Sequence, residues 1–159
     1  MGLDMYLIRI KKGEQPLWEE NNEVAYWRKA NAIHNWMVKN VQNNVDDCEY
    51  YPISKEQLET LKKLCEDLKS KIVLTKGKVV DYYSFNGFGK EIPHFVDGNV
   101  VNNVEVCEEM LPTVDGFFFG TTNYDDWYYQ QLLRTIEQLD KVLKETNFDE
   151  EEIYYTSSW

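Results

Sequence analysis

The stretch "LDMYLIRI", residues 3–10, is the best guide to the fold, because it is a compact run of β-forming and apolar residues. Such a run predicts a strand at or near the centre of a sheet. From Glu23 to about Asn44 the pattern becomes helical, and apolar residues recur at spacings of four and three. This predicted stripe consists of Tyr26, Ala30, Ile33, Met37 and Val41. A strand followed by an amphipathic helix indicates a fold with both element types.

A second helix has a clear predicted start. Ser54 and Gln57 stand three positions apart, as the two partners of a capping box do. Apolar residues then mark the buried side of this helix, namely Leu58, Leu61, Cys65, Leu68 and Ile72. Just before it, "EYYPI" (49–53) predicts a short edge strand, because Pro52 has no N–H to donate to a strand ladder.

Residues 75–108 differ in character from the segments on either side. Asn86-Gly87 and Asp97-Gly98 are strong hairpin-turn signals, and they separate three β-leaning runs, "KVVDYYSF", "FGKEIPHFV" and "NVVNNVEV". The region therefore predicts an inserted β-meander of three strands. Pro93 indicates a bulge or a sheet edge in the middle run.

The remaining third of the chain predicts a strand, a helix and a final strand. "GFFFG" (116–120) is a short apolar run bounded by glycines, and "IYYTSSW" at the end of the sequence is rich in β-forming residues. Between them Thr122 or Asn123 can cap a helix whose first turn contains Asp125 and Asp126. The expected buried residues of that helix are Leu132, Ile136, Leu139 and Leu143.

These elements predict an α+β protein that forms a single domain over residues 1–159. We expect a mixed or antiparallel β-sheet packed by about three helices, with the β-meander of 75–108 inserted into it. The sheet would combine the strand at 3–10, the "GFFFG" strand and the last strand.

Composition limits the function classes. The net charge is −11 and the isoelectric point is near 4.6, so the surface repels phosphate backbones and general nucleic-acid binding is disfavoured. The three cysteines are far apart and form no CxxC pair, which is typical of a protein from a reducing compartment. The start has no signal-peptide pattern and no apolar run reaches the ~20 residues of a membrane span. We therefore expect a cytoplasmic protein without a membrane partner.

Polar and aromatic residues gather on one flank of the first predicted helix. On a helical wheel Trp27, Arg28, Asn31, His34 and Asn35 lie together beside the apolar stripe. A ring for stacking, a guanidinium for phosphate and amides for polar edges suit a nucleotide-type ligand. Lys29 adds a second cation next to Arg28. The alternative is a helix boundary whose tryptophan packs inward and whose amides cap neighbouring loops.

A second polar-aromatic face belongs to the predicted helix that follows "GFFFG". Tyr124, Trp127 and Gln131 lie away from its apolar stripe, and Thr122 stands in the turn before it. Anions bind readily at helix starts, although the two aspartates there already supply negative charge. We predict these residues as further ligand contacts.

The chemistry of common enzyme families is missing. His34 and His94 are the only histidines and have no metal-ligand spacing, and there is no P-loop, GxSxG or HExxH motif. The sequence therefore predicts no catalytic residue, no metal site and no cofactor, and a non-enzymatic function is favoured.

Four segments, "MGLDMYL", "EVAYWRKANAIHNWMVKNVQ", "LPTVDGFFFGTTNYDDWYYQQL" and "EIYYTSSW", resemble a family of small uncharacterised proteins encoded by bacteriophages and prophages. The resemblance covers about two thirds of the chain and excludes the region of about 75–108. It implies an accessory protein in the host cytosol and carries no catalytic residue with it. Such proteins often act against the host, whose immune systems signal through modified or cyclic nucleotides.

Several functions follow as hypotheses. The first is a non-catalytic protein that binds and sequesters a small nucleotide-derived ligand, such as a host immune signal. The second is an acidic inhibitor or DNA mimic that binds a host defence protein through Asp149–Glu152 and other carboxylates. The third is a nucleotide hydrolase or lyase that uses His34 and nearby acids. A structural accessory protein without a small ligand, and a homo-oligomer, also stay open.

Overall fold

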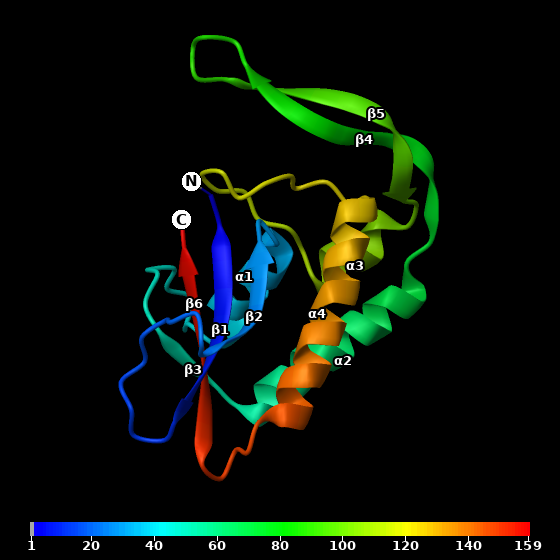
Figure 1. Ribbon diagram of the computed structural model, residues 1–159. Helices are drawn as coiled ribbons and strands as arrows, with labels where there is room; N and C mark the ends of the chain where they lie inside the picture. The colour runs from blue at the N-terminus through cyan, green and yellow to red at the C-terminus, as the bar shows by residue number, and fades with distance from the viewer. Residues whose placement is uncertain (1) are drawn as a thin grey trace.

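A computed structural model describes residues 2–159 as an α+β fold with two antiparallel sheets (Figure 1). Among these residues there are four helices, where about three were expected. The elements in chain order are β1 (Asp4–Lys11), β2 (Glu23–Arg28), α1 (Asn31–Asn40), β3 (Tyr51–Ile53), α2 (Lys55–Lys71), β4 (Leu74–Phe85), β5 (Glu91–Val101), α3 (Val104–Met110), α4 (Asp126–Glu145) and β6 (Glu151–Ser158).

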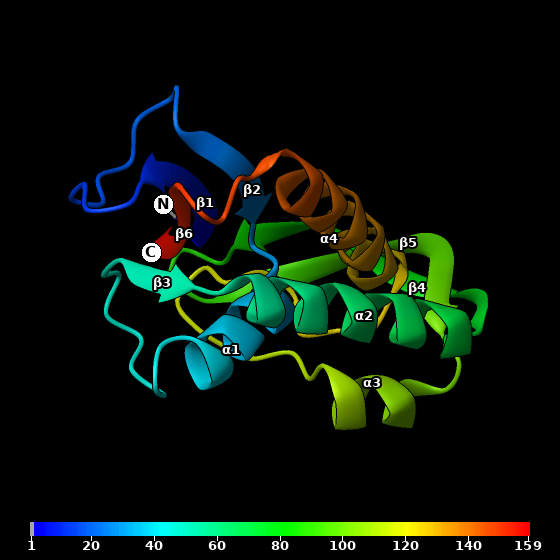
Figure 2. The ribbon, with the colours of Figure 1, turned by 90° about the horizontal axis from the view of Figure 1, so that it is seen from below.

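Strand β1 lies inside the larger sheet, whose strand order is β2-β1-β6-β3. It pairs with β2 on one side and with β6 on the other, both antiparallel. Met5 and Leu7 are fully buried, whereas the intervening Tyr6 is only partly buried, as the two-residue period of a strand requires. Helices α1, α2 and α4 lie to one side of this sheet (Figure 2). The prediction of a near-central first strand is confirmed.

The helix predicted from Glu23 is wrong over its first six residues. Glu23–Arg28 form β2, which pairs with β1 in a register that places Tyr26 opposite Tyr6. Ala25 and Trp27 face the core at a spacing of two. The chain then turns at Lys29, whose φ is +55°, before α1 begins. The predicted stripe holds only from Ala30 onward, through Ile33, Met37 and Val41, all of which are buried.

Helices α2 and α4 follow the sequence pattern closely. The capping box of α2 is confirmed, with Gln57 N–H donating to the Ser54 hydroxyl at 3.1 Å and the Gln57 side chain accepting from Ser54 N–H at 2.9 Å. Helix α4 starts two to three residues later than expected. Its N-cap is Asp125, which accepts a hydrogen bond from Tyr128 N–H, and not Thr122 or Asn123. The two helices pack against each other along their apolar sides.

The region of 75–108 contains a two-stranded hairpin and not a three-stranded meander. Strands β4 and β5 pair along their length, and the tip of the hairpin holds Asn86-Gly87. Asp97-Gly98 lies inside β5, opposite Lys78 and Gly77, and makes no turn. We call residues 74–101 the arm, because this ribbon extends over the rest of the molecule (Figure 1).

The "GFFFG" segment is a turn in a loop and not a strand. Phe118 has a φ of +55°, and Phe119 N–H donates to the Gly116 carbonyl at 3.2 Å. Only Phe119 of the three phenylalanines is buried, while Phe117 is exposed. The last strand is confirmed as β6, which begins two residues earlier than expected. None of the helices in residues 2–159 combines the length and apolar composition that a membrane span requires.

Candidate functional site

A pocket lies where the start of α1, the loop of residues 111–125 and the first turns of α4 meet. Its empty volume is about 310 Å³, part of it open to solvent. The cavity volume that can be compared with the ~300–1,000 Å³ of small-molecule sites is only about 20 Å³, so the enclosed part of the pocket is small. Its deeper walls are apolar and include Ala30, Ile33, Leu111 and Leu132. Its polar and aromatic lining residues include Lys29, Thr113, Thr121, Asn123, Trp127 and Gln131.

Helix α4 contributes a ring and an unsatisfied amide. Its buried side faces the core through Tyr128, Leu132, Thr135 and Leu139, which leaves Trp127 and Gln131 one turn apart at the edge of that side. The Trp127 side chain is 47% exposed and lines the pocket. The Gln131 Oε1 atom is buried and has no hydrogen-bond partner among residues 2–159. A buried acceptor of this kind favours a ligand that donates a hydrogen bond to it.

The start of α1 contributes positive potential. Its N-cap residue, Ala30, offers no side-chain hydrogen bond, and its first turn contains no acidic residue. The N-terminal amides of α1 therefore keep their capacity to bind an anion. Lys29 precedes this turn and forms no ion pair within the described chain. Its stem lies so close to Gly2 and Gly120 that a Cβ at either glycine would approach it to 3.0 Å.

Asn31 lines the pocket, but its amide is used to hold the loop. The Asn31 Nδ2 group donates to the carbonyls of Phe119 and Thr121, at 3.1 and 2.9 Å, and Oδ1 accepts from Val114 N–H at 3.1 Å. Asn35, one turn further on, donates to the Pro112 carbonyl at 3.2 Å. The prediction that Asn31 and Asn35 read a ligand is corrected, because both amides bind the loop backbone.

The predicted residues of the second face also support the loop. The Tyr124 hydroxyl accepts from Thr113 N–H at 3.1 Å, and the Thr122 carbonyl accepts from the Thr113 hydroxyl at 2.9 Å. Tyr124 packs edge-on against Tyr128, with ring centroids 5.0 Å apart. Neither Tyr124 nor Thr122 lines the pocket, while Trp127 and Gln131 do.

Trp27 and Arg28 lie outside the pocket, which corrects the predicted stacking role of Trp27. The Trp27 side chain is fully buried in the core, and its indole N–H donates to the Thr135 hydroxyl at 2.9 Å. Arg28 is on the opposite side of β2 and forms an ion pair with Asp4 at 2.7 Å. The cause is the strand geometry of β2, since neighbouring residues of a strand point to opposite faces.

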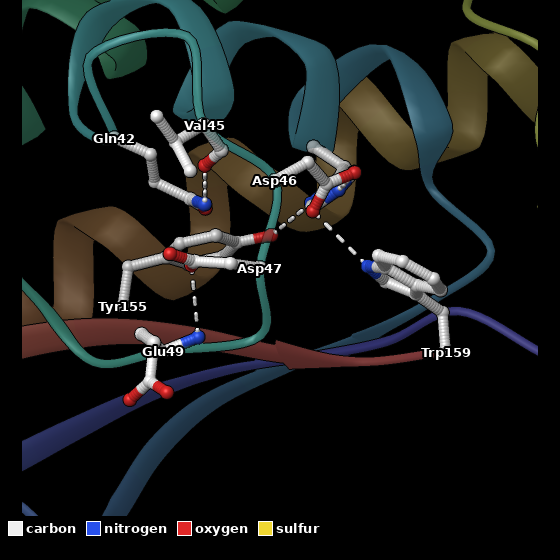
Figure 3. A network of polar contacts seen from close by, with 8 residues as sticks. Gln42, Val45, Asp46, Asp47, Glu49, Tyr155 and Trp159 are labelled. Atoms are coloured by element: carbon white, nitrogen blue, oxygen red, sulfur yellow. Dashed lines mark hydrogen bonds and ion pairs between the residues drawn. The ribbon is translucent and has the colours of Figure 1, made fainter.

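His34 belongs to a separate polar network and not to the pocket. Figure 3 shows Asp46, Tyr155 and Trp159 of this network. The His34 ring is 1% exposed, with Nε2 2.9 Å from a carboxylate oxygen of Asp46 and Nδ1 2.6 Å from the Tyr155 hydroxyl. Because Asp46 can only accept when ionised, these contacts fit a neutral ring that donates from Nε2 and accepts from Tyr155. The other Asp46 oxygen accepts from the Trp159 indole N–H at 3.0 Å.

Burial determines the titration of this network. It lowers the pKa of His34, against the opposing effect of Asp46, and it raises the pKa of Tyr155 well above its ordinary value. A neutral, buried His34 with both ring nitrogens in use does not reach a ligand. The prediction of His34 as a ligand contact is corrected.

Thr113, Thr121 and Asn123 line the pocket from the loop, although sequence reasoning did not predict them as ligand contacts. The turn before α4 was recognised as a helix start, but only contacts with α1 bring it to the pocket. No group of His, Cys, Asp and Glu side chains suited to a metal ion occurs in residues 2–159. No family model, curated protein or solved structure matches this chain.

Proposed function

We propose that the protein is a non-catalytic binder of a small nucleotide-type ligand, and that the pocket between α1 and α4 is the binding site. The observation that carries this proposal is the combination of an exposed ring, a buried unsatisfied acceptor and a cation around one apolar pocket. Trp127 offers the ring, Gln131 the acceptor and Lys29 the cation.

Each of these features matches one part of a nucleotide. A nucleobase stacks on an indole and carries N–H groups that can donate to the Gln131 Oε1 atom. A phosphate is attracted to Lys29 and to the uncapped start of α1. Because the enclosed cavity is only about 20 Å³, a base would lie at the mouth of the pocket on the exposed Trp127 ring, while the phosphate stays at the Lys29 end. The resemblance to phage proteins makes host immune nucleotides the first ligands to test.

The proposal is tested by isothermal titration of the folded protein against mononucleotides, cyclic dinucleotides and nucleotide sugars. We expect one member of the panel to bind, and Trp127→Leu and Lys29→Gln each to weaken it by about 10-fold or more. Lys39→Gln is the matched control, because Lys39 lies in the last turn of α1, at the end opposite Lys29. No heat with any ligand, or equal losses with Lys29→Gln and Lys39→Gln, would contradict the proposal.

The mass of the ligand after incubation with the protein distinguishes a binder from an enzyme. We propose no catalytic role for His34, because it is buried with both nitrogens bonded. The ligand recovered after long incubation should keep its mass. A changed mass would support the nucleotide hydrolase or lyase hypothesis instead.

Protein binding is a second candidate function, and the arm favours it. The arm exposes several large apolar side chains, among them Phe88 at 93% and Phe85 at 59%. Exposed apolar clusters of this kind mark interaction surfaces. The arm contains three lysines and three acidic residues, so it is neutral on a chain of net charge −11. Its partner would be a protein with an apolar surface of low charge.

The acidic-inhibitor hypothesis makes a different prediction, since it relies on Asp149–Glu152. Part of that segment is used internally, because Glu151 pairs with Arg9 at 3.5 Å and accepts from Asn147 N–H. A host protein that is captured by the native chain and lost from a Phe85→Ser/Phe88→Ser variant supports the arm. Capture that is lost only when Asp149 and Glu150 are neutralised supports the acidic surface.

A further inference from the structure

A second hollow lies on the face of the main sheet that is opposite the buried Met5 and Leu7. Its empty volume is about 690 Å³, counted with the space that is open to solvent. Strand β1 supplies Tyr6, and the segment before β3 supplies Tyr50. The loop of residues 12–22 supplies Trp18. The remaining lining residues are Cys48, Thr156, Ser157 and Ser158.

The aromatic wall of this hollow is held in place by hydrogen bonds. Trp18 N–H donates to the Tyr50 hydroxyl at 2.9 Å, and the Trp18 indole N–H donates to the Glu23 carboxylate at 2.8 Å. The rings of Tyr6 and Trp18 are 5.6 Å apart and are inclined by 54°, so they form two walls of a corner. The loop itself is fixed by Asn22, whose side chain binds the Leu17 carbonyl at 2.8 Å.

The electrostatics of the hollow favour a cation. No lysine or arginine is among its lining residues. The Glu23 carboxylate lies at the edge of the Trp18 indole, and burial, Asp4 and Glu23 together raise the pKa of the Tyr6 hydroxyl. Arg28 acts in the other direction there and is paired with Asp4, so these two charges offset each other and Glu23 is the carboxylate that favours a cation. Ring faces attract cations through their quadrupole, and the Glu23 carboxylate near the Trp18 ring adds to this attraction.

We propose that the hollow formed by Tyr6, Trp18 and Tyr50 binds a quaternary ammonium group, of the kind that choline and trimethyllysine carry. The methyl groups of such a cation contact ring faces, and the charge needs no hydrogen-bond donor or acceptor in return. This site is distinct from the α1–α4 pocket and shares no lining residue with it.

The decisive measurement compares a cation with its neutral isostere. The folded protein is titrated with choline and with 3,3-dimethylbutan-1-ol, in which carbon replaces the charged nitrogen, and binding is followed by NMR shifts or calorimetry. We expect choline to bind with a millimolar dissociation constant and the alcohol to bind about 10-fold more weakly or not at all. Equal affinities, or no choline binding to the folded protein, would overturn the proposal.

Three variants test the named residues. Trp18→Leu should weaken choline by about 10-fold, while Trp127→Leu, which changes the other pocket, should leave choline unaffected. Because Trp18→Leu can also loosen the loop, Glu23→Gln is the second test. Its amide oxygen still accepts from the Trp18 indole, but the charge is gone, so choline should bind about three-fold more weakly. Unchanged affinity in both Trp18→Leu and Glu23→Gln would refute the site.

A pair of peptides identifies the source of the cation. A peptide with one trimethyllysine that binds at least 10-fold more tightly than choline, while its unmodified form does not bind, indicates a modified protein as the natural ligand. Equal affinity for choline and for the methylated peptide indicates a small-molecule or headgroup ligand. A preference for the unmodified peptide would contradict recognition of a quaternary ammonium.

Discussion

Replacing Asn31 by alanine tests how the pocket is built. The Asn31 side chain is 3% exposed, and it makes three hydrogen bonds to the loop backbone, at 2.9, 3.1 and 3.1 Å. Each bond is worth about 1 kcal/mol net, and the loop groups that lose it are partly shielded from water. We therefore expect Asn31→Ala to lower the free energy of unfolding by about 3 kcal/mol. For a chain of this size that corresponds to a fall in Tm of about 6–12 °C.

The assay is urea unfolding followed by circular dichroism, with thermal unfolding as a second measure. Asn35→Ala is the matched control, because Asn35 lies one turn along the same helix and makes one bond to the loop, to the Pro112 carbonyl. It should cost about 1 kcal/mol. If Asn31→Ala costs no more than Asn35→Ala, the Asn31 amide does not hold the loop through three hydrogen bonds. If Asn31→Ala lowers the free energy of unfolding by about 3 kcal/mol but leaves ligand binding unchanged, the idea that the loop shapes the pocket is refuted.

Three further outcomes are expected. Burial lowers the pKa of His34 below its value in the unfolded chain, so the unfolded state is protonated first as the pH falls. The free energy of unfolding should therefore fall as the pH drops from about 7 to 5. In urea titrations at several pH values, His34→Gln should flatten this pH dependence. Phe88→Ser should change the unfolding free energy by less than about 0.5 kcal/mol, because the ring is 93% exposed, and a larger change would show that the arm tip packs on the body. In native protein, iodoacetamide should label Cys48 first, because Cys65 and Cys107 are fully buried. Burial also raises the pKa of Cys65 to about 12 and that of Cys107 to about 11. Mass mapping that finds either buried thiol labelled as fast as Cys48 would contradict this.

The parts of the fold that could be predicted are those with a long, unambiguous period. Helix α2 combines a capping box with a stripe of buried residues over 17 positions, and both signals agree. Strand β1 spans eight residues and is apolar enough to require a place inside the sheet. The prediction of a strand at 116–120 was wrong for the opposite reason. Three phenylalanines in a row have no period, and Phe118 adopts a positive φ that no local signal announces.

The segment 23–28 was assigned to a helix because six residues fit two periods equally well. Tyr26 and Ala30 are four apart, as on a helix, while Ala25 and Trp27 are two apart, as on a strand. The pairing of β2 with β1 decides between them, and that contact lies outside the segment. On a strand Trp27 and Arg28 point to opposite faces, so they do not share the flank that the predicted helix would have given them.

Some of the predicted site residues supply hydrogen bonds to the loop of 111–125, and this decides which of them stay available for a ligand. This loop has almost no regular structure, so its backbone amides and carbonyls need partners from elsewhere. Asn31, Asn35, Tyr124 and Tyr128 supply them, the last by donating to the Leu111 carbonyl at 2.7 Å.

A polar residue near a helix start can thus serve either the loop or a ligand, and sequence alone does not separate the two. The structure separates these two roles by whether the polar atoms of the side chain already have hydrogen-bond partners within the protein. A side chain whose polar atoms are all bonded internally, such as Asn31, builds the wall of the pocket. A side chain with an exposed ring or an unsatisfied atom, such as Trp127 or Gln131, keeps its capacity to bind. By this criterion only Lys29, Trp127 and Gln131 of the predicted residues both line the pocket and retain a group for a ligand.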